Sequence, residues 1–535
     1  MNAVELLDRA ARIRPDTAAI IAGPAGRESV LTYAALVERS RRLASLFAEA
    51  GLRAGDGMAI MLPMSAELYA VIAAAWRLGV VPVFMDPNAG DAHFERCIRR
   101  YPVRAFVGTP AACLLRLASP TLRKIPHAFV SGVLFPGARP LRAARHCAPS
   151  KDACPCADDD LAMIAFTSGS TGQPKGIRRT HELLLATHAV LSAHVKPEGG
   201  EVALATLPMF TLTNLACGAT SLIPDVDLRH PGRVDPNRIV DQLERWCARS
   251  AVASPALLEL VADRCLTQRH TLESLQQIFV GGAPVFPPLL DKLTRMAPHA
   301  RVAVLYGSTE AEPIALLSST EVSAEDVART MHGRGLLAGP PIQEISLRIL
   351  RDRWGSALKA GTPETLERET LQSGQPGEIV IAGPHVAAGY LGGEGDAETK
   401  FLVGDQIWHR TGDAGWLDER GRLWLLGRCA ARIEDALGTL YPYAVEAALS
   451  FHPGVVRSAF LSHRGERLLV LEMRERAQQP DVRALLRPLD WASIAAVVLL
   501  KHIPVDARHN AKVDYPALRR ALDTEKWRRR IAIGG

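Results

Sequence analysis

The chain has 535 residues, 48% of them hydrophobic, and a formal net charge of +6. That length is too great for one compact core, so we expect two or more domains. The net charge is small and the basic residues are scattered, so a nucleic-acid groove is not indicated, and a small anionic substrate fits equally well. Because the sequence has no run of about 18 apolar residues, and because Glu5 and Asp8 stand where a signal peptide needs a basic start, we expect a cytoplasmic protein without an integral membrane segment.

The cysteine pattern indicates reduced thiols rather than a disulfide framework, since the nine cysteines are an odd number spread over a long chain. Cys154 and Cys156 form the only close pair, and no second pair follows at metal-ligand spacing. His181 and Glu182 begin a zinc-like pattern, but Leu185 stands where the second histidine is required. A zinc site is therefore not predicted.

Up to residue 160, helical patterns alternate with short apolar strands, which is typical of an α/β fold. We predict a helix over 33–47 and strands at 58–62 and 79–84. The same rhythm continues in strands at 161–166, 201–206, 251–254, 277–280 and 302–306. Because these apolar runs do not alternate strictly, they indicate sheets that are covered on both faces.

The last third of the chain differs from the rest in composition and in its predicted elements. Residues 352–376 are rich in Gly, Pro, Thr and Glu, which predicts a solvated loop or hairpin insertion. Strands at 378–381, 408–416 and 422–426, with a tight turn at 418–421, predict a small β element. We place a domain boundary near Gly427 and Arg428, which gives domains 1–427 and 428–535. The second domain should carry helices at 443–449, 482–489 and 515–522 and a solvated, basic terminal helix at 526–530.

The most informative segment follows the strand at 161–166. Residues 166–176 read Phe-Thr-Ser-Gly-Ser-Thr-Gly-Gln-Pro-Lys-Gly. Glycines let the backbone approach phosphate oxygens, hydroxyls donate hydrogen bonds, and Lys175 adds a positive charge. The loop is not a Walker A motif, because Pro174, Lys175 and Gly176 replace the required lysine followed by Ser or Thr. A polar surface turn is the alternative, but the preceding buried strand and the Pro-Lys-Gly ending favour a polyphosphate loop.

Later segments offer the groups that a bound nucleotide requires. Gly281-Gly282-Ala283-Pro284 follows a strand and can bring backbone close to a flat ring. Tyr306-Gly307-Ser308-Thr309-Glu310 offers an aromatic ring, a phosphate donor and a carboxylate for Mg²⁺. Asp413 can accept both ribose hydroxyls, Gly427 and Arg428 follow it, and Lys512 is a lone lysine near the C-terminus. Taken singly, Tyr306 also suits a core, Asp413 a turn and Lys512 a solvated surface.

In this order and spacing, the segments resemble the adenylate-forming superfamily, which includes acyl-CoA synthetases, luciferases and peptide-synthetase adenylation domains. The resemblance covers essentially the whole chain. It implies an α/β fold in which a large N-terminal domain of stacked α/β sheets with a β element precedes a small, mobile α+β C-terminal domain. It also implies an enzyme that uses ATP and Mg²⁺ to convert a carboxylic acid into acyl-AMP with release of pyrophosphate.

The resemblance also assigns the site residues. The phosphates of ATP would be held by Thr167, Ser168, Gly169, Ser170, Thr171, Gly172 and Lys175. Adenine would be framed by Gly282, Ala283, Pro284, Tyr306 and Gly307. Thr309 would bind the α-phosphate, Glu310 the Mg²⁺, and Asp413 with Arg428 the ribose. Lys512 would bridge the substrate carboxylate and the α-phosphate, where a fixed cation offsets the repulsion between two anions.

Two departures from the common pattern point to one branch of the superfamily. Ala430 stands where a charged hinge residue is usual, and residues 208–214 lack the usual Phe-His pair. With residues 306–313 and 504–512, they resemble the olefin β-lactone synthetases, which activate a long-chain 2-alkyl-3-hydroxy acid. In that branch the substrate's own 3-hydroxyl attacks the acyl-adenylate and closes a β-lactone, which is a problem of orientation. Candidates for the acyl pocket, and equally for core packing, are Phe210, Leu215 and Gly281.

Two alternatives stay open at this point. One is a ligase that transfers an acyl or aryl group to CoA or to a carrier protein, and the other is a weakened adenylate-binding or regulatory protein, suggested by the altered hinge. Arg508 and His509 either act on the substrate hydroxyl or hold phosphate or carboxylate. The expected partners are a small carboxylic acid and, depending on the branch, other biosynthetic enzymes or a carrier protein.

Overall fold

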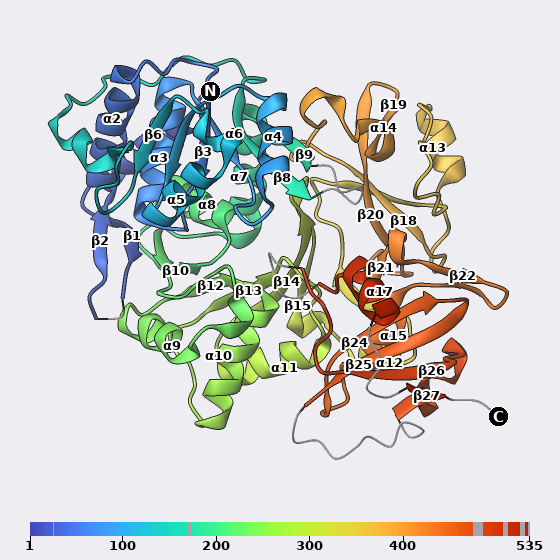
Figure 1. The fold of residues 1–535 in the computed structure, drawn as a ribbon. Helices are drawn as coiled ribbons and strands as arrows, with labels where there is room; N and C mark the ends of the chain where they lie inside the picture. Colours follow the sequence, from blue (N-terminus) through green and yellow to red (C-terminus); the bar gives the residue numbers. More distant parts are fainter. Residues whose placement is uncertain (25, 169–173, 475–484, 507–511, 525–529, 533–535) are drawn as a thin grey trace.

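The structure is a computed structural model that describes the chain except for residues 25, 169–173, 475–484, 507–511, 525–529 and 533–535. Two large, mainly parallel sheets with helices around them are followed by an antiparallel β element and a small C-terminal part (Figure 1). The predicted α/β fold class, with a large N-terminal and a small C-terminal domain, is confirmed. The helices up to the β element are α1 Val4–Ile13, α2 Tyr33–Glu49, α3 Ala66–Leu78, α4 Asp91–Arg100, α5 Pro110–Ala118, α6 Pro120–Arg123, α7 His181–Val195, α8 Pro208–Cys217, α9 Pro236–Arg245, α10 Pro255–Thr267, α11 Pro287–Met296 and α12 Ala324–Met331.

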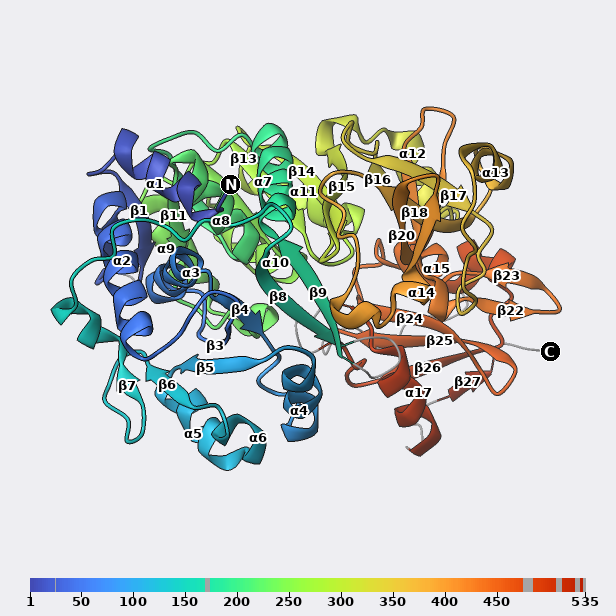
Figure 2. The same cartoon turned by 90° about the horizontal axis from the view of Figure 1, so that it is seen from above.

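The first sheet carries the predicted phosphate loop. Its strand order is β7-β6-β5-β3-β4-β8-β9, and all neighbours are parallel except β8 and β9. The strands are β3 Gly57–Met61, β4 Val81–Phe84, β5 Val103–Gly108, β6 His127–Val130, β7 Arg139–Pro140, β8 Leu161–Ser168 and β9 Pro174–Thr180. The antiparallel pair β8 and β9 extends from this sheet toward the β element (Figure 2). The strand ends that border the predicted phosphate loop, at Ser168 and Pro174, therefore point toward the β element.

The second sheet carries the predicted adenine segments. Its order is β15-β14-β13-β12-β10-β11-β1-β2, with antiparallel pairs only at its two edges. The strands are β1 Ala18–Ala22, β2 Ser29–Thr32, β10 Val202–Ala205, β11 Thr220–Ile223, β12 Ser250–Ala253, β13 Gln277–Gly281, β14 Arg301–Ser308 and β15 Ala311–Ser318. Ligands in such sheets bind beyond the carboxyl ends of the parallel strands. The segments after β13 and along β14 end on that side.

The β element is an antiparallel sheet in the order β16-β21-β20-β18-β17, with β19 beside β20. Its elements are β16 Leu336–Gly339, β17 Ser346–Leu350, α13 Pro363–Glu369, β18 Gly377–Ala382, α14 Asp396–Thr399, β19 Lys400–Val403, β20 Gln406–Leu417 and β21 Leu423–Arg428. The turn between β20 and β21 is the predicted one at 418–421, where Gly421 has a φ of 71°.

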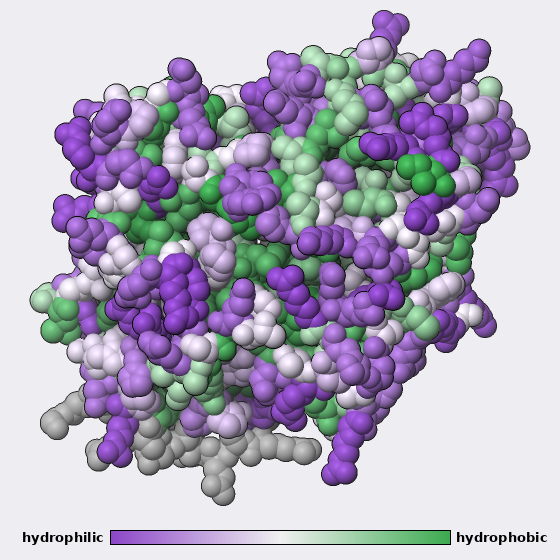
Figure 3. All heavy atoms as spheres, turned by 180° about the vertical axis from the view of Figure 1, so that it is seen from behind, coloured by the Kyte–Doolittle hydropathy of each residue, from purple (hydrophilic) through white to green (hydrophobic). Residues whose placement is uncertain are grey.

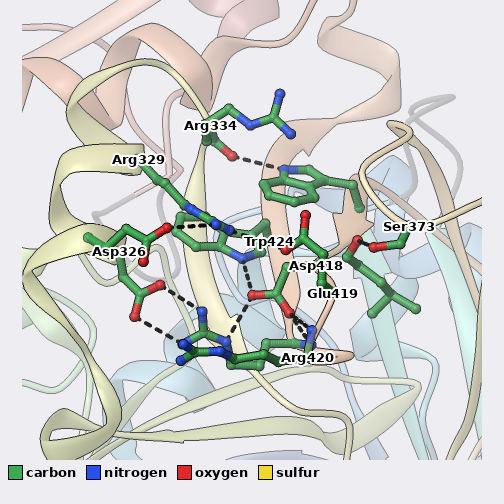
Figure 4. A network of polar contacts seen from close by, with 12 residues as sticks. Asp326, Arg329, Arg334, Ser373, Asp418, Glu419, Arg420 and Trp424 are labelled. Carbon is green, nitrogen blue, oxygen red and sulfur yellow. Dashed lines mark hydrogen bonds and ion pairs between the residues drawn. The ribbon is translucent and has the colours of Figure 1, made fainter.

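A buried ionic network joins this turn to α12 (Figure 4). Arg422 donates to both carboxylate oxygens of Asp326, at 2.9 and 2.7 Å, and to Asp418 at 2.9 Å. The indole N–H of Trp424 also donates to Asp418, at 3.1 Å. Burial acts to raise the pKa of Asp326, but Arg422 and the hydrogen bonds from Ser323 together outweigh it and lower that pKa to about 2. The network fixes α12, on which the C-terminal part rests.

The C-terminal part packs a four-stranded sheet, in the order β24-β25-β26-β27, between two small apolar cores. Its elements are β22 Ile433–Asp435, β23 Gly438–Leu440, α15 Pro442–Leu449, β24 Val455–His463, β25 Glu466–Met473, β26 Ala496–Leu500, α17 Tyr515–Thr524 and β27 Arg530–Ala532. Helix α15 packs against β21 and α12. The ring of Trp491 covers Gly333, just after α12, so closely that a Cβ there would lie 2.2 Å from it.

Most predicted elements are confirmed within two residues at each end, including the strands of both large sheets and the helices at 33–47, 443–449 and 515–522. One expectation was wrong. Residues 352–376 contain helix α13, because the Thr362 side chain caps it and Pro363 occupies its first turn. Of the predicted helix at 482–489, residues 482–484 lie outside the described residues, Leu485 and Leu486 are α-helical, and a 3-10 helix follows at Arg487–Ala492.

The helix predicted for the C-terminal tail lies almost entirely outside the described residues. Of the predicted helix at 526–530, only Arg530 lies within the described residues, and it begins strand β27. Ile531 pairs with Val497 of β26 and packs against the adjoining apolar core. Residues 530–532 therefore form the edge strand of this sheet.

Hydrophilic residues cover most of the face seen in Figure 3, with hydrophobic residues showing between them. The large hydrophobic side chains that are exposed, such as Ile13, Val133 and Leu437, come from different parts of the chain. Among the described residues, none of the helices combines the length and apolar character that a membrane span requires.

Candidate active site

Three side chains from two sheets meet at the predicted ribose position, and we call them the ribose cluster: Tyr306, Asp413 and Arg428. The Tyr306 hydroxyl donates to Asp413 Oδ2 at 2.8 Å, and Arg428 donates to Asp413 Oδ1 at 2.9 Å. Asp413 and Arg428 face each other across β20 and β21, so the strand register brings them together. Burial and the carboxylate raise the pKa of Tyr306, which keeps its hydroxyl protonated as a donor. The Arg428 side chain is 60% exposed and can reach a ligand.

The predicted Mg²⁺ ligand, Glu310, lies at the turn between β14 and β15. Its Oε1 accepts a hydrogen bond from the Tyr390 hydroxyl at 2.8 Å. Burial alone would raise the pKa of Glu310, but His409, the Tyr390 hydroxyl and Lys400 together lower it. Glu310 therefore offers an ionised oxygen ligand. Mg²⁺ commonly takes one or two carboxylates and completes its shell with phosphate and water, so this donor fits the ion.

Lys175 lies on β9 at the edge of the phosphate loop. It is 8% exposed, contacts Glu398 Oε2 at 3.0 Å and lies 5.5 Å from the centre of the Tyr390 ring. Lys400 lies over the same ring at 5.7 Å and donates to the carbonyl of Ala387. Two lysines thus flank one aromatic ring whose hydroxyl holds Glu310. Positive charges and a carboxylate converge where the polyphosphate is expected.

Part of the predicted phosphate loop lies outside the described residues, namely Gly169, Ser170, Thr171 and Gly172. The backbones of Thr167 and Ser168 end β8, where they pair with Lys175 and Pro174 of β9. The same holds in the C-terminal part for Arg508 and His509, which lie outside the described residues. Their predicted roles stay predictions.

The adenine segments lie where two neighbouring strands end. Gly282, Ala283 and Pro284 follow β13 and are partly exposed, and Gly282 has a φ of 83°, which favours glycine. Gly307 lies against the neighbouring backbone, since a Cβ there would be 2.9 Å from the carbonyl oxygen of Ala311. Such close backbone approach suits a flat ring. Tyr306, which belongs to the ribose cluster, immediately precedes Gly307, so these segments lie beside that cluster.

Lys512 lies on an exposed turn of the C-terminal part. Its N–H donates to Asp506 Oδ1 at 3.0 Å, and the Asp506 N–H donates to the Lys512 carbonyl at 2.9 Å. Burial raises the pKa of Tyr443, and the carboxylates of Asp413 and Asp506 add to the rise. Tyr443 therefore lies near both the ribose cluster and the turn that carries Lys512. Tyr443 of the C-terminal part thus lies beside the ribose cluster.

A second group of three residues, which we call the hinge cluster, holds the chain just beyond Arg428: Asp352, Arg432 and Tyr441. Arg432 lies 2.7 Å from Asp352 Oδ2, and the Tyr441 hydroxyl donates to the same oxygen at 2.8 Å. Asp352 belongs to the β element and is 6% exposed. Ala430 lacks a polar side chain, so these neighbours supply the polar contact at the hinge.

The acyl-pocket candidates are all buried. Phe210 is 1% exposed and packs in an apolar core, and a Cβ on Gly281 would lie 2.7 Å from the Leu305 carbonyl. Leu215 lines a cavity of about 50 Å³ between α1, α3, α7 and α8, which Met209 also lines. That volume holds a few water molecules, not an alkyl chain. Core packing explains the burial of all three, and their contact with substrate stays a prediction.

Several polar residues of the site were not singled out from the sequence: Arg179, Tyr390, Glu398 and Lys400. Arg179 stands next to Arg178, which is exposed, so no signal in the sequence distinguishes the buried arginine from the exposed one. The other three come from the segment after β18, where the Gly389-Tyr390 pair follows a buried strand as the other site segments do.

The comparisons with known proteins agree with this geometry. The model of the family described as "AMP-binding enzyme" matches residues 7–391, which is more than half of the chain. The chain belongs to this family. An olefin beta-lactone synthetase from Xanthomonas campestris pv. campestris is 32% identical over 96% of each chain. A 2-succinylbenzoate–CoA ligase from Bacillus licheniformis is 28% identical over 84% of this chain and 85% of its own.

A solved structure, ATP-bound MatB from Rhodopseudomonas palustris, superposes with a TM-score of 0.79, covering 98% of this chain and 99% of its own at 22% identity. That likeness supports the fold alone. The family and the relatives identify this AMP-binding enzyme as an AMP-forming acid ligase that uses ATP. The alternative of a regulatory protein is therefore not carried further.

Proposed function

We propose that this AMP-binding enzyme adenylates a long-chain 2-alkyl-3-hydroxy acid and closes it to a β-lactone. In the first step a carboxylate oxygen bonds to the α-phosphorus of ATP, and pyrophosphate leaves. In the second, the 3-hydroxyl oxygen bonds to the acyl carbon, the acyl–phosphate bond breaks, and AMP leaves while the hydroxyl proton passes to solvent. The observation that carries the proposal is the similarity to an olefin beta-lactone synthetase over almost the entire length of both chains.

The site residues have distinct proposed tasks in the first step. Lys175 and the loop before it hold the outer phosphates, while the ribose cluster holds the sugar. Mg²⁺ bound by Glu310 and the phosphates would neutralise charge on the leaving pyrophosphate. Thr309 contacts the α-phosphate, and Lys512 approaches the carboxylate from the C-terminal part. Fixed charges of this kind stabilise the transition state because they need no reorganisation.

The hinge supports an internal acceptor for the second step. An acceptor that enters from outside needs a path to the acyl-adenylate, whereas a hydroxyl of the bound acid is already there. Asp352, Arg432 and Tyr441 fasten the C-terminal part to the β element, and the Trp491 ring covers Gly333. Such a fastened arrangement suits a reaction that needs no new partner between its two steps.

Thiol-free turnover tests the proposal. With ATP, Mg²⁺ and a 2-alkyl-3-hydroxy acid, we expect AMP release over many turnovers, and with the 3-deoxy acid a single turnover that stops at acyl-AMP. Discharge of acyl-AMP only after CoA or a carrier protein is added would instead establish the ligase, which the 2-succinylbenzoate–CoA ligase relative favours.

Lys512 is tested through the first step alone. We expect Lys512→Ala to slow acid-dependent pyrophosphate exchange by about 10²–10³-fold, as removal of a preorganised charge donor does elsewhere. Lys501→Ala, which removes another exposed lysine of the same part, is the matched control and should leave exchange unchanged. Equal rates in the two variants would exclude Lys512 from the reacting centre.

A further inference from the structure

One edge of the first sheet combines exposed apolar side chains with an excess of positive charge. Residues 96–151 contain eleven Arg and Lys residues and no Asp or Glu, whereas the net charge of the whole chain is only +6. The rest of the chain is therefore acidic on balance. The segment runs from α4 through β5, α5, α6, β6 and β7, which lie together at one edge of the molecule (Figure 2). Charge of one sign on one edge attracts a partner of the opposite charge.

Helix α5 turns an apolar face to the solvent. Its exposed residues are all apolar and lie on one side of the helix: Ala111, Leu114, Leu117 and Ala118. Leu114 is 61% exposed and Leu117 is 45% exposed. The one charged residue of the helix, Arg116, lies on another side and donates to the Ile125 carbonyl at 2.8 Å. Since a surface helix normally turns polar residues outward, this reversed pattern indicates an apolar partner.

Two more exposed apolar residues, Val133 and Leu134, lie beside the N-terminus of α5. They are 67% and 64% exposed. The loop that carries them leaves β6 next to the end of β5, because the Ser131 N–H donates to the Gly108 carbonyl at 2.9 Å, and α5 begins two residues after Gly108. The loop and α5 also pack against the same apolar core (Figure 2). We call their large exposed side chains the apolar patch: Leu114, Leu117, Val133 and Leu134.

Three exposed basic side chains lie at the other end of α5, and we call them the basic group: Arg104, Arg123 and Lys124. Arg123 ends α6, which begins two residues after α5 ends, and Lys124 follows it. Arg104 precedes Ala105, which pairs with His127 of β6, so Arg104 lies beside the segment that leads from α6 into β6. The apolar patch and the basic group therefore belong to one continuous surface.

Carboxylates elsewhere in the chain offset only part of this charge. Three arginines of the segment form ion pairs with glutamates outside it: Arg99, Arg100 and Arg139. Within the part of the chain that the structure describes, Arg104 and Arg123 have no ion-pair partner, and Lys124 is attracted to Asp91. That carboxylate already accepts hydrogen bonds from the side chains of Ser119 and Thr121. The basic group is thus available to anions from outside.

An anionic lipid surface matches both features. The apolar side chains of a short helix and a loop can enter the boundary between head groups and acyl chains, while arginine and lysine beside them attract the lipid phosphates. An acidic protein would match the charge but would give no reason for four large apolar side chains around it. The observations therefore favour lipid over protein as the partner.

We propose that this edge of the molecule binds reversibly to membranes that contain anionic lipids, with the apolar patch inserted and the basic group on the lipid phosphates. The contact is peripheral, since the nine residues of α5 cannot cross a bilayer. Its benefit, access to a long-chain acid that partitions into lipid, rests on the proposed function. The binding itself does not: a failed lactone assay leaves vesicle binding unchanged, and lost vesicle binding leaves turnover of a dissolved acid unchanged.

Co-sedimentation of the full chain with vesicles tests the proposal. Vesicles of phosphatidylcholine alone are compared with vesicles of phosphatidylcholine and phosphatidylglycerol, each at low and at high salt. We expect binding to the anionic vesicles to be about 100-fold stronger, because each basic residue at an anionic surface adds to the attraction. High salt should remove most of this difference by screening the charges. Absence of binding to the anionic vesicles at low salt would overturn the proposal.

Two double variants separate the charge from the apolar contact. Arg123→Gln with Lys124→Gln should weaken binding to the anionic vesicles about 30-fold and leave binding to phosphatidylcholine unchanged. Leu114→Ser with Leu117→Ser should weaken binding to both kinds of vesicle about 10-fold, because the lost apolar burial does not depend on lipid charge. All four side chains are exposed, and pyrophosphate exchange with a dissolved acid shows that each variant is folded.

Matched controls come from the β element. Leu402→Ser with Ile407→Ser removes another exposed apolar pair, and Lys359→Gln with Arg368→Gln removes two other exposed positive charges. Both should bind anionic vesicles as the wild type does, and losses equal to those of the first two variants would overturn the proposal. Sedimentation velocity without lipid provides the last readout. A self-association that the leucine variant abolishes, together with absence of vesicle binding, would assign this edge to contact between two copies of the chain instead.

Discussion

Two regions of the molecule repeat one arrangement, in which a single carboxylate holds a tyrosine hydroxyl and an arginine. In the ribose cluster, Asp413 accepts from Tyr306 at 2.8 Å and from Arg428 at 2.9 Å. The second region is the hinge cluster. It contains the same three residue types at nearly the same distances. Its arginine, Arg432, lies four residues after Arg428 in the chain.

The two clusters differ in their access to solvent. In the hinge cluster the carboxylate is 6% exposed and Arg432 is 24% exposed, whereas in the ribose cluster Asp413 is 19% exposed and Arg428 is 60% exposed. Burial lets the hinge cluster hold the C-terminal part against the β element, because a desolvated ion pair is costly to break. Exposure leaves the ribose cluster able to exchange its contacts with solvent for contacts with a ligand. The same chemistry can thus serve structure or binding, and burial decides which.

The largest effect is expected at the hinge. Asp352→Ala leaves Arg432 and the Tyr441 hydroxyl without their common acceptor, and breaking a buried pair in this way costs about 3–5 kcal/mol. We expect a lower free energy of unfolding in urea and faster proteolytic cleavage near residue 430, with ATP affinity retained. Asp405→Ala, at an exposed position of the β element, should change none of these. A loss of ATP affinity without a loss of stability would contradict the distinction between the clusters.

A third carboxylate, that of Glu446, is also buried, and its effect on stability depends on pH. Glu446 on α15 accepts hydrogen bonds from the Tyr515 hydroxyl and, at 3.0 Å, from the Phe460 N–H. Burial dominates and raises its pKa from 4.5 to about 7. The folded protein therefore binds this proton more tightly than the unfolded chain does. The contribution of Glu446 to stability is complete below pH 4.5 and is lost as pH rises through about 7.

Urea unfolding at a series of pH values measures this loss. The shift corresponds to about 3 kcal/mol, at 1.36 kcal/mol per pK unit. Glu446→Gln keeps the shape of the side chain without the titration, so the fall in unfolding free energy between pH 4.5 and 7 should shrink by that amount. An unchanged pH profile in the variant would exclude Glu446 as its source.

At the ribose cluster we expect an effect on binding rather than on stability. Asp413→Ala removes the acceptor proposed for the ribose hydroxyls, and the loss of charge-assisted hydrogen bonds should lower kcat/KM for ATP by about 100-fold. Unfolding should change little, because Arg428 is already 60% exposed and can be hydrated. The KM for the acid provides the internal control. If it rises as much as the KM for ATP, Asp413 does not act on the nucleotide alone.

The sequence predicted the fold and much of the ribose cluster because both depend on local signals. Apolar runs marked the strands, and short motifs at the strand ends marked Tyr306, Asp413 and Arg428. The hinge cluster was not predicted, because Asp352 lies in a segment with the composition of a loop and its partners come 80 and 89 residues later. Arg179 was missed for a related reason. Only the tertiary structure shows that it meets Thr309, which is 130 residues away.

The smallest effect gives the most closely matched test, since the same substitution can be made in each cluster. Tyr306→Phe and Tyr441→Phe each remove one hydroxyl from a carboxylate that keeps its arginine, which costs about 1 kcal/mol. In the ribose cluster this loss should raise the KM for ATP by about fivefold with little change in unfolding, because Asp413 can take a water in place of the hydroxyl. In the hinge cluster it should lower the free energy of unfolding and leave the KM for ATP unchanged, because Asp352 is closed to water. If both variants changed the same quantity, the difference in exposure would not explain how the two clusters are used.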